Sequence, residues 1–202
     1  MDTNILYAVL LGLSLAASTG LNTFLPLLML AGAAHFKVLD ASQVLNGSFA
    51  WIASGGALTA LALAAVVEVV GDKIPAVDHL LDGFGTLARP VVGAFAAASV
   101  FTNADPAMAA LAGLVIGAPT ALGFHAAKAG TRAASSATTL GVANPVLSTI
   151  EDIVAVLFPI VGLVAPLLVP VVLVLVIWVM WRLFKRARAR WPLNRRRSIT
   201  VT

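Results

Sequence analysis

Long apolar runs separated by short polar segments cover most of this chain. Such runs predict membrane-spanning helices, because a span needs about 20 mostly apolar residues. Six segments are expected to cross, at residues 5–33, 50–71, 87–103, 107–127, 146–163 and 165–184. The pattern predicts an all-α fold: a polytopic membrane helical bundle in residues 1–184 and a basic cytoplasmic tail in residues 185–202.

The first, fifth and sixth of these segments are irregular, and broken helices are expected there. The first is interrupted by STGLNTFLP, where Gly20, Asn22 and Pro26 are expected to break or kink the helix. The fifth and sixth are separated only by GLVAP, so one long bent segment is an open alternative to two spans.

A faint internal likeness relates the two halves of the chain. Two small-residue stretches with hydroxyls, AASTGLNTFLP and KAGTRAASSATT, are each followed by an acid-bearing apolar stretch, VVEVVGDKIP and STIEDIVAVLFP. Three spans per half would make the halves inverted repeats, an arrangement frequent in secondary transporters. Two inverted three-helix repeats and a bundle without internal symmetry remain the two alternatives.

Composition agrees with a membrane protein and excludes several other classes. The chain is 60% hydrophobic and 11% charged, with a mean hydropathy of +0.98, whereas soluble domains are usually under half apolar. It has no cysteine, which excludes a disulfide framework and a thiolate site. The net charge of +4 does not indicate nucleic-acid binding, because eight of the thirteen Lys and Arg residues lie in residues 182–202, beside a span.

The distribution of Lys and Arg predicts the orientation. Twelve basic residues fall on one side and one, Lys37, on the other if both termini are cytoplasmic. The twelve are the eight of the tail with Lys73, Arg89, Lys128 and Arg132. By the positive-inside rule we expect a multi-pass membrane protein with both termini cytoplasmic.

Carboxylates within the apolar runs are the first candidate chemistry. Glu68 and Asp72 are four residues apart, hence on one helical face, at the end of an apolar run. A carboxylate in hydrocarbon is costly, so it indicates a functional site. Asp78 and Asp82 repeat the spacing beyond Pro75, and we expect them to be surface charges on a short helix.

Glu151 and Asp152 form a second acidic pair, and two starts of their helix are open. If Asn144 caps a helix that Pro145 opens, the acids lie about two turns in. If Ser148 is the cap and Glu151 closes a capping box, they lie in the first turn.

Basic residues of HAAKAGTRAASSATT fall on one helical face. His125, Lys128 and Arg132 share this face with Ser135 or Ser136 and with Thr139. The stripe is expected to hold an anion such as a lipid phosphate, or to neutralise the acids. The residues assigned as counter-charge or anion-binding are Lys73, His125, Lys128 and Arg132.

A charge sum favours a cation or proton over an anion. Six acids face four bases, which leaves about two negative charges to be compensated. The acids are Glu68, Asp72, Asp78, Asp82, Glu151 and Asp152, and the bases are Lys73, Arg89, Lys128 and Arg132. Oxygen ligands suit Mg²⁺, Ca²⁺ or Mn²⁺, although the metal stays unknown. The sequence has no HExxH or GxSxG motif, and we expect neither an enzyme nor a cofactor.

Taken together, four stretches resemble a family of small bacterial inner-membrane proteins described only as a domain of unknown function. They are GLSLAASTGLNTFLPLL, VEVVGDKIPAVDHLLD, HAAKAGTRAASSATT and NPVLSTIEDIVA, within residues 8–165. In that family the first motif often carries an arginine after the glycine, whereas Leu21 follows Gly20 here. The run from Glu68 to Ile74 is also similar to the E-x-G-D-K-T signature of membrane calcium/manganese transporters, with one extra residue and no threonine.

The sequence therefore predicts a small secondary transporter for a cation or proton. Its expected ligands are Glu68, Asp72, Glu151 and Asp152. The alternatives are a lipid-headgroup-binding or lipid-handling protein, using Lys128 and Arg132, and a membrane scaffold that binds partners through its tail. Membrane lipids and a divalent cation or proton are the expected partners, without nucleic acid, and a homo-oligomer is an open alternative.

Overall fold

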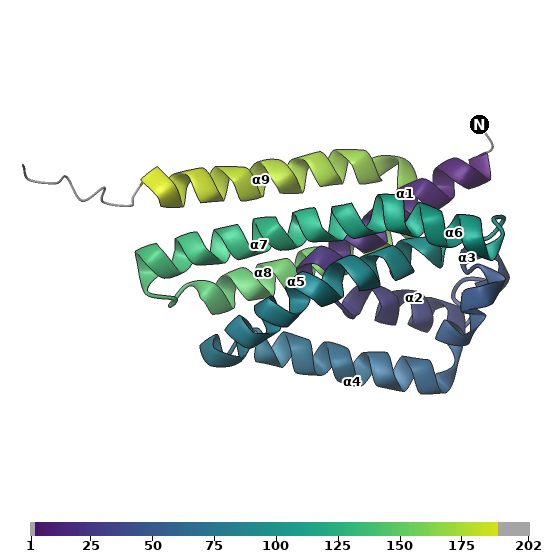
Figure 1. Ribbon diagram of the computed structural model, residues 1–202, viewed down its shortest axis with the longest axis horizontal. Helices are drawn as coiled ribbons and strands as arrows, with labels where there is room; N and C mark the ends of the chain where they lie inside the picture. Colours follow the sequence, from purple (N-terminus) through teal and green to yellow (C-terminus); the bar gives the residue numbers. More distant parts are fainter. Residues whose placement is uncertain (1–2, 190–202) are drawn as a thin grey trace, which may run out of the picture.

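The computed structural model describes residues 3–189, except for the side chains at positions 3–4, 75–76, 78–79 and 187–189. The described chain consists of helices joined by short turns and has no strand, which confirms the all-α prediction (Figure 1). Its elements are α1 (Thr3–Leu21), α2 (Leu25–His35), α3 (Ala41–Val44), η1 (Gly47–Ala53), α4 (Gly55–Gly71), α5 (Pro75–Ala98), α6 (Pro106–Ala112), η2 (Gly113–Gly117), α7 (Ala118–Thr139), α8 (Asn144–Val164), η3 (Pro166–Leu168) and α9 (Val169–Ala189).

The first apolar segment is a helical hairpin, so the prediction of a single span at residues 5–33 is wrong. The chain breaks at residues 22–24, and α2 then begins with Pro26 in its first turn, where the missing N–H is harmless. Leu27 and Leu30 of α2 pack in one core with Leu11 and Leu15 of α1, so α2 folds back along α1. The tip of this hairpin, residues 21–24, therefore lies inside the bundle (Figure 1).

The remaining long elements run along the bundle (Figure 1). Among the described residues, Pro106–Thr139, Asn144–Val164 and Pro166–Arg186 are long and apolar enough to cross a membrane. Gly47–Ala53 and Gly55–Gly71 make a fourth if their 67° bend lies within one span. Three or four candidate spans are thus found, and the predicted six are not confirmed. The predicted third segment, residues 87–103, belongs to the longer helix α5, which carries charged residues.

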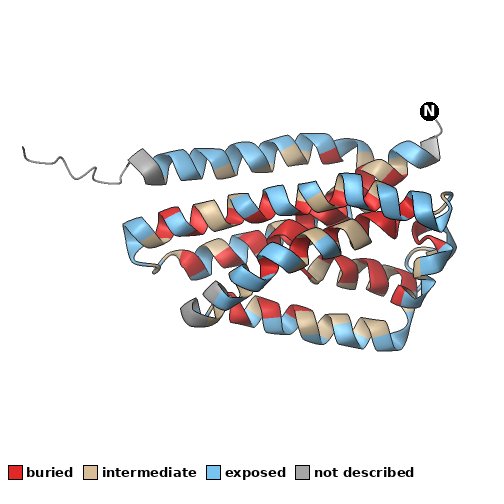
Figure 2. Ribbon diagram, viewed as in Figure 1, coloured by how far each residue is buried: buried red, intermediate tan, exposed pale blue. Residues whose placement is uncertain are grey.

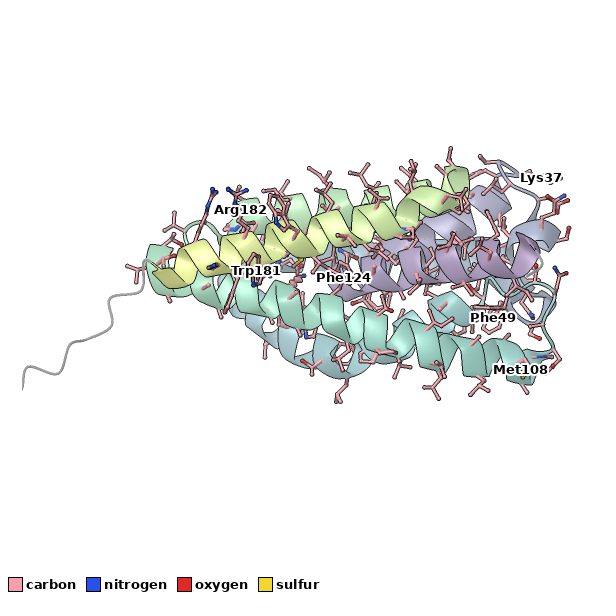
Figure 3. All side chains as sticks on the ribbon, turned by 90° about the horizontal axis from the view of Figure 1, so that it is seen from above. Lys37, Phe49, Met108, Phe124, Trp181 and Arg182 are labelled. Carbon is pink, nitrogen blue, oxygen red and sulfur yellow. The ribbon has the colours of Figure 1, made fainter. Side chains whose placement is uncertain are left out.

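The two ends of the described chain lie at opposite ends of the bundle, with the start of α1 at one and the end of α9 at the other (Figure 1). Lys37 and Phe49 lie at the first end, and Trp181 and Arg182 lie towards the second (Figure 3). How the bundle lies in a membrane is not fixed by this arrangement, so two cytoplasmic termini stay a prediction.

Small residues bring the central helices into close contact. A Cβ atom at Gly117 would lie 2.3 Å from the carbonyl oxygen of Gly93, and one at Gly20 would lie 2.5 Å from the carbonyl oxygen of Ala121. Such close backbone approach allows the dense van der Waals packing that holds helices together in lipid. Buried residues concentrate in α1 and the facing sides of α5, α7 and α8, whereas α9 is mostly exposed (Figure 2).

The internal likeness of the two halves does not extend to their structures. AASTGLNTFLP forms the end of α1, the break and the start of α2, whereas KAGTRAASSATT lies in the uninterrupted helix α7. The two inverted three-helix repeats are therefore not confirmed.

The end of α7 supplies a prediction of stability. Leu140 adopts a left-handed conformation with φ of 53° and is 93% exposed. This conformation costs most L-residues roughly 1–2 kcal/mol, while asparagine tolerates it. Leu140→Asn is therefore expected to raise the free energy of unfolding by about 1 kcal/mol, measured as a higher Tm in detergent. Val142 is 80% exposed without a positive φ, so Val142→Asn is the control, and an equal rise there would contradict the explanation.

Candidate functional site

Charged side chains from α4, α5, α7 and α8 converge on the tip of the α1–α2 hairpin. Six of them are buried and form what we term the buried ionic network: Glu68, Asp72, Arg89, Lys128, Arg132 and Glu151. Arg89 and Lys128 have no solvent exposure at all. Charges so deeply buried persist only when they are paired and hydrogen-bonded, and each of the six has an ionic partner.

Glu68 closes the tip of the hairpin. Its carboxylate accepts the backbone N–H of Thr23 at 2.8 and 3.0 Å, the Thr23 hydroxyl at 2.8 Å and the backbone N–H of Phe24 at 3.3 Å. These N–H groups lie at the start of α2, where they have no partner within the helix and where the helix dipole favours a negative charge. A residue of α4 thus completes the hydrogen bonding of the break between α1 and α2.

Arg89 joins this cap to the neighbouring helices. Its guanidinium lies 3.3 Å from the Glu68 carboxylate and donates to the carbonyl oxygen of Gly20 at 3.2 Å and to the Thr23 hydroxyl at 3.4 Å. It also bonds Nδ1 of His125, whose Nε2 lies 3.0 Å from the hydroxyl of Thr86. One arginine therefore contacts α1, α4 and α7 from its place on α5.

Asp82 lies close to this arginine rather than on an open surface. Its side chain is 20% exposed, and its Oδ1 is 3.9 Å from Arg89 Nη1. The prediction of a surface charge is therefore wrong for Asp82, because α5 is long and turns this residue towards Arg89. The side chains of Asp78 and His79 lie outside the described residues.

The other four members of the network form a second cluster. Lys128 Nζ lies 2.7 Å from Asp72 Oδ2 and donates to the carbonyl oxygen of Leu21 at 2.9 Å. Arg132 Nη2 lies 2.7 Å from Glu151 Oε2 and 3.3 Å from Asp72 Oδ2. Lys128 is also 3.7 Å from Glu151. Both carboxylates are thus shared by the same two bases.

Lys73 and Asp152 form a more exposed pair beside this cluster. Lys73 Nζ lies 3.0 Å from Asp152 Oδ2, with side-chain exposures of 38% and 15%. Asn22 at the hairpin tip donates to Asp152 Oδ1 at 3.2 Å. Exposed ion pairs contribute little to stability, so this contact positions the tip more than it holds the fold.

The structure thus brings the predicted acidic pairs together through the predicted bases. Glu68 and Asp72 of α4 meet Glu151 and Asp152 of α8 around the hairpin tip, and no two of them are in direct contact. Helix α8 begins at Asn144, so the acids lie about two turns in and the alternative start at Ser148 is wrong. Asn144 is the first helical residue and not the cap, because Ala143 precedes the helix and no side chain caps it.

Arg89 is the central residue that the sequence assignment left out. Its position within an apolar run carried the same signal as that of Glu68, a charge inside a predicted span. In the sequence, Arg89 enters only the count of inner bases and the charge sum, because its partners Gly20 and Thr23 are more than sixty residues away in the chain.

The carboxylates are poorly placed to share a divalent metal. No group of three or more Asp, Glu, His or Cys residues in the described chain has the geometry of a metal site. Asp72 and Glu151 each contact both Lys128 and Arg132, and these two positive charges oppose a divalent cation that bridges the carboxylates. A proton, which needs no ligand shell, suits this arrangement better.

Two cavities reach the network from the outside of the bundle. One, of about 200 Å³, lies against α8 and α9 and ends at Glu151. The other, of about 280 Å³, lies between the hairpin tip, α4 and α5 and ends at Glu68. Apart from these carboxylates and the hydroxyls of Thr131 and Thr23, both cavities are lined by apolar side chains and Gly85.

Comparison with known proteins identifies a family. No curated protein and no solved structure matches the sequence. The model of the family described as a domain of unknown function (DUF4126) matches residues 9–186, which include every member of the buried ionic network. The chain therefore belongs to the DUF4126 family.

Proposed function

We propose that this protein is a small proton-coupled secondary transporter of the bacterial inner membrane. One observation carries the proposal: buried carboxylates and bases from four helices meet at the tip of a broken helical hairpin. Ionisable residues inside a membrane domain typically belong to ion or proton pathways. Discontinuous helices with polar tips near the middle of the bilayer are a recurring feature of transporter sites.

The sharing of partners within the network supports a mechanism. Protonation of Glu151 removes one of the two negative charges that hold Lys128 and Arg132, so both bases turn towards Asp72. Because Lys128 also holds the carbonyl oxygen of Leu21, this exchange pulls on the hairpin tip. The network thus has two discrete arrangements, and alternating access depends on a switch between two such states.

The arrangement in the membrane follows from the bundle and its charges. In this proposal α4, α5, the continuous helix Pro106–Thr139 (α6, η2 and α7, here termed the α6–α7 rod), α8 and α9 cross the membrane, and α1–α2 is re-entrant. The end of α9, with its basic residues, is cytoplasmic, and the end that carries Lys37 faces outwards. Trp178 and Trp181 stack against Arg182 and Lys185 near the inner surface, an environment that suits both residue types.

The alternative of lipid-phosphate binding has less support from the geometry. Lys128 and Arg132 are buried and already paired with Asp72 and Glu151. A phosphate there has to displace these carboxylates, which then become unpaired charges.

A charge-movement measurement tests the proposal without knowledge of the substrate. Proteoliposomes on a solid-supported membrane are exposed to a pH step, and the transient current is recorded. The wild-type protein is expected to give a current from protonation of the network, and Glu151→Gln is expected to lose nearly all of it. Asp40, an exposed carboxylate that caps α3, provides the control Asp40→Asn, which should keep the current. A full current from folded Glu151→Gln would contradict the proposal.

A further inference from the structure

The cavity at Glu151 has the form of a binding site for an apolar molecule. It holds about 200 Å³ and is lined mainly by aliphatic side chains of α8 and α9, among them Ile150, Val154 and Val176. Its rim includes Ile150 and Leu175, which are more than half exposed on the outside of the bundle. In a membrane this surface faces lipid, so a ligand enters from the hydrocarbon side.

The polar end of the cavity offers only hydrogen-bond acceptors. Every hydrogen bond and ion pair made by Glu151 in the described chain uses Oε2, which leaves Oε1 without a donor. Thr131, the other polar lining residue, gives its hydroxyl hydrogen to the carbonyl oxygen of Lys128 and keeps only lone pairs. A ligand that satisfies this end of the cavity must therefore donate hydrogen bonds.

The charge of the surroundings favours a cation. Among the described Asp, Glu, Lys and Arg side chains around the tip, the carboxylates are five and the bases are four, which leaves one negative charge. The acids are Glu68, Asp72, Asp82, Glu151 and Asp152, and the bases are Lys73, Arg89, Lys128 and Arg132. A single ammonium group compensates this charge and supplies the donors that Glu151 Oε1 lacks.

We propose that the cavity between α8 and α9 binds a lipophilic amine, with the ammonium group on Glu151 Oε1 and the apolar body among the aliphatic side chains. This assignment rests on the proposed function only in that it makes lipophilic amines the substrate class of the proposed transporter. Binding competes with the proton for Glu151, and this competition couples the two.

The second cavity provides an internal comparison. It also ends at a carboxylate, but both oxygens of Glu68 are engaged: Oε1 by Thr23 and Arg89, and Oε2 by Thr23 and Phe24. An amine there finds no free acceptor on Glu68. The same class of ligand is therefore expected in the first cavity and not in the second.

Calorimetry with a matched pair of probes tests the assignment. The full chain in lipid nanodiscs is titrated with 1-adamantanamine and with 1-adamantanol, which share one apolar cage and differ in charge. The amine is expected to bind and the alcohol to bind much more weakly. Glu151→Gln should weaken amine binding by about 10- to 100-fold, the loss expected for one hydrogen bond to a charged group.

If Glu151→Gln does not fold, variants that fill one cavity or the other test where the amine binds. Val176→Phe fills the first cavity and is expected to abolish amine binding, whereas Val67→Phe in the second cavity should leave it unchanged. Equal binding of the two probes, or unaltered amine binding by Val176→Phe, would overturn the site. If Glu151→Gln loses the pH-step current but still binds the amine fully, the amine site at Glu151 is wrong and the proposed transport stands. If the wild-type protein binds the amine but gives no current, the proposed transport is wrong and the amine site stands.

Discussion

Replacing Arg89 with methionine is expected to destabilise the protein by about 3–5 kcal/mol, the usual consequence of removing one partner from a buried ion pair. The side chain is fully buried, and its loss leaves the Glu68 carboxylate without its ionic partner and the carbonyl oxygen of Gly20 without its donor. The measurement is the Tm of the purified protein in detergent. Arg182→Met, at an exposed position on α9, should change the Tm little.

The double variant Glu68→Gln/Arg89→Met tests the physical reason. It carries no buried charge at this pair, and the glutamine oxygen still accepts the N–H of Thr23. We expect it to regain most of the stability lost by Arg89→Met, because the penalty comes from the unpaired carboxylate. A double variant less stable than Arg89→Met would show that the arginine acts through packing alone.

Replacing Gly117 with alanine is the second change with a large expected effect. The new Cβ would lie 2.3 Å from the carbonyl oxygen of Gly93 and 2.8 Å from the Cα of Ala94. These are backbone atoms, so relief requires α5 to move away from the α6–α7 rod. Overpacking of this kind costs about 1–3 kcal/mol and sometimes more, and the Tm measured in detergent should fall accordingly.

Gly123 offers a matched control on the same rod. A Cβ there meets no atom within 4 Å, so alanine adds no clash and improves helix propensity by up to about 1 kcal/mol. Gly123→Ala is therefore expected to leave the Tm unchanged or to raise it. An equal fall in Tm for Gly117→Ala and Gly123→Ala would show that the close contact between α5 and η2 is not what constrains Gly117.

The hydrophobic pattern predicted most of the helices but not the path of the chain. The apolar runs around α4, α8 and α9 were found because membrane helices carry a strong local signal. The break at Asn22 was also expected, since Gly20 and Pro26 flank it. The reversal of α2 along α1 was not, because it depends on packing between side chains, and no local pattern shows which way the chain turns.

The candidate site was predicted in the same partial way. Glu68 and Glu151 stand out in the sequence because a charge within an apolar run is costly and rare. Their partners are a different matter. Glu68 bonds Thr23, which is 45 residues away, and Arg132 of α7 bonds Glu151 of the next helix, α8. These pairings follow from the packing of the helices in the assembled bundle.

The hairpin tip has a consequence for how this protein is made. Its N–H groups at Thr23 and Phe24 are satisfied by Glu68, and its carbonyl groups at Gly20 and Leu21 by Arg89 and Lys128. In lipid, backbone groups need partners, and α1 and α2 on their own leave those of the tip unsatisfied. The hydrogen bonding of the hairpin tip is thus completed only after residue 128 has been added to the growing chain.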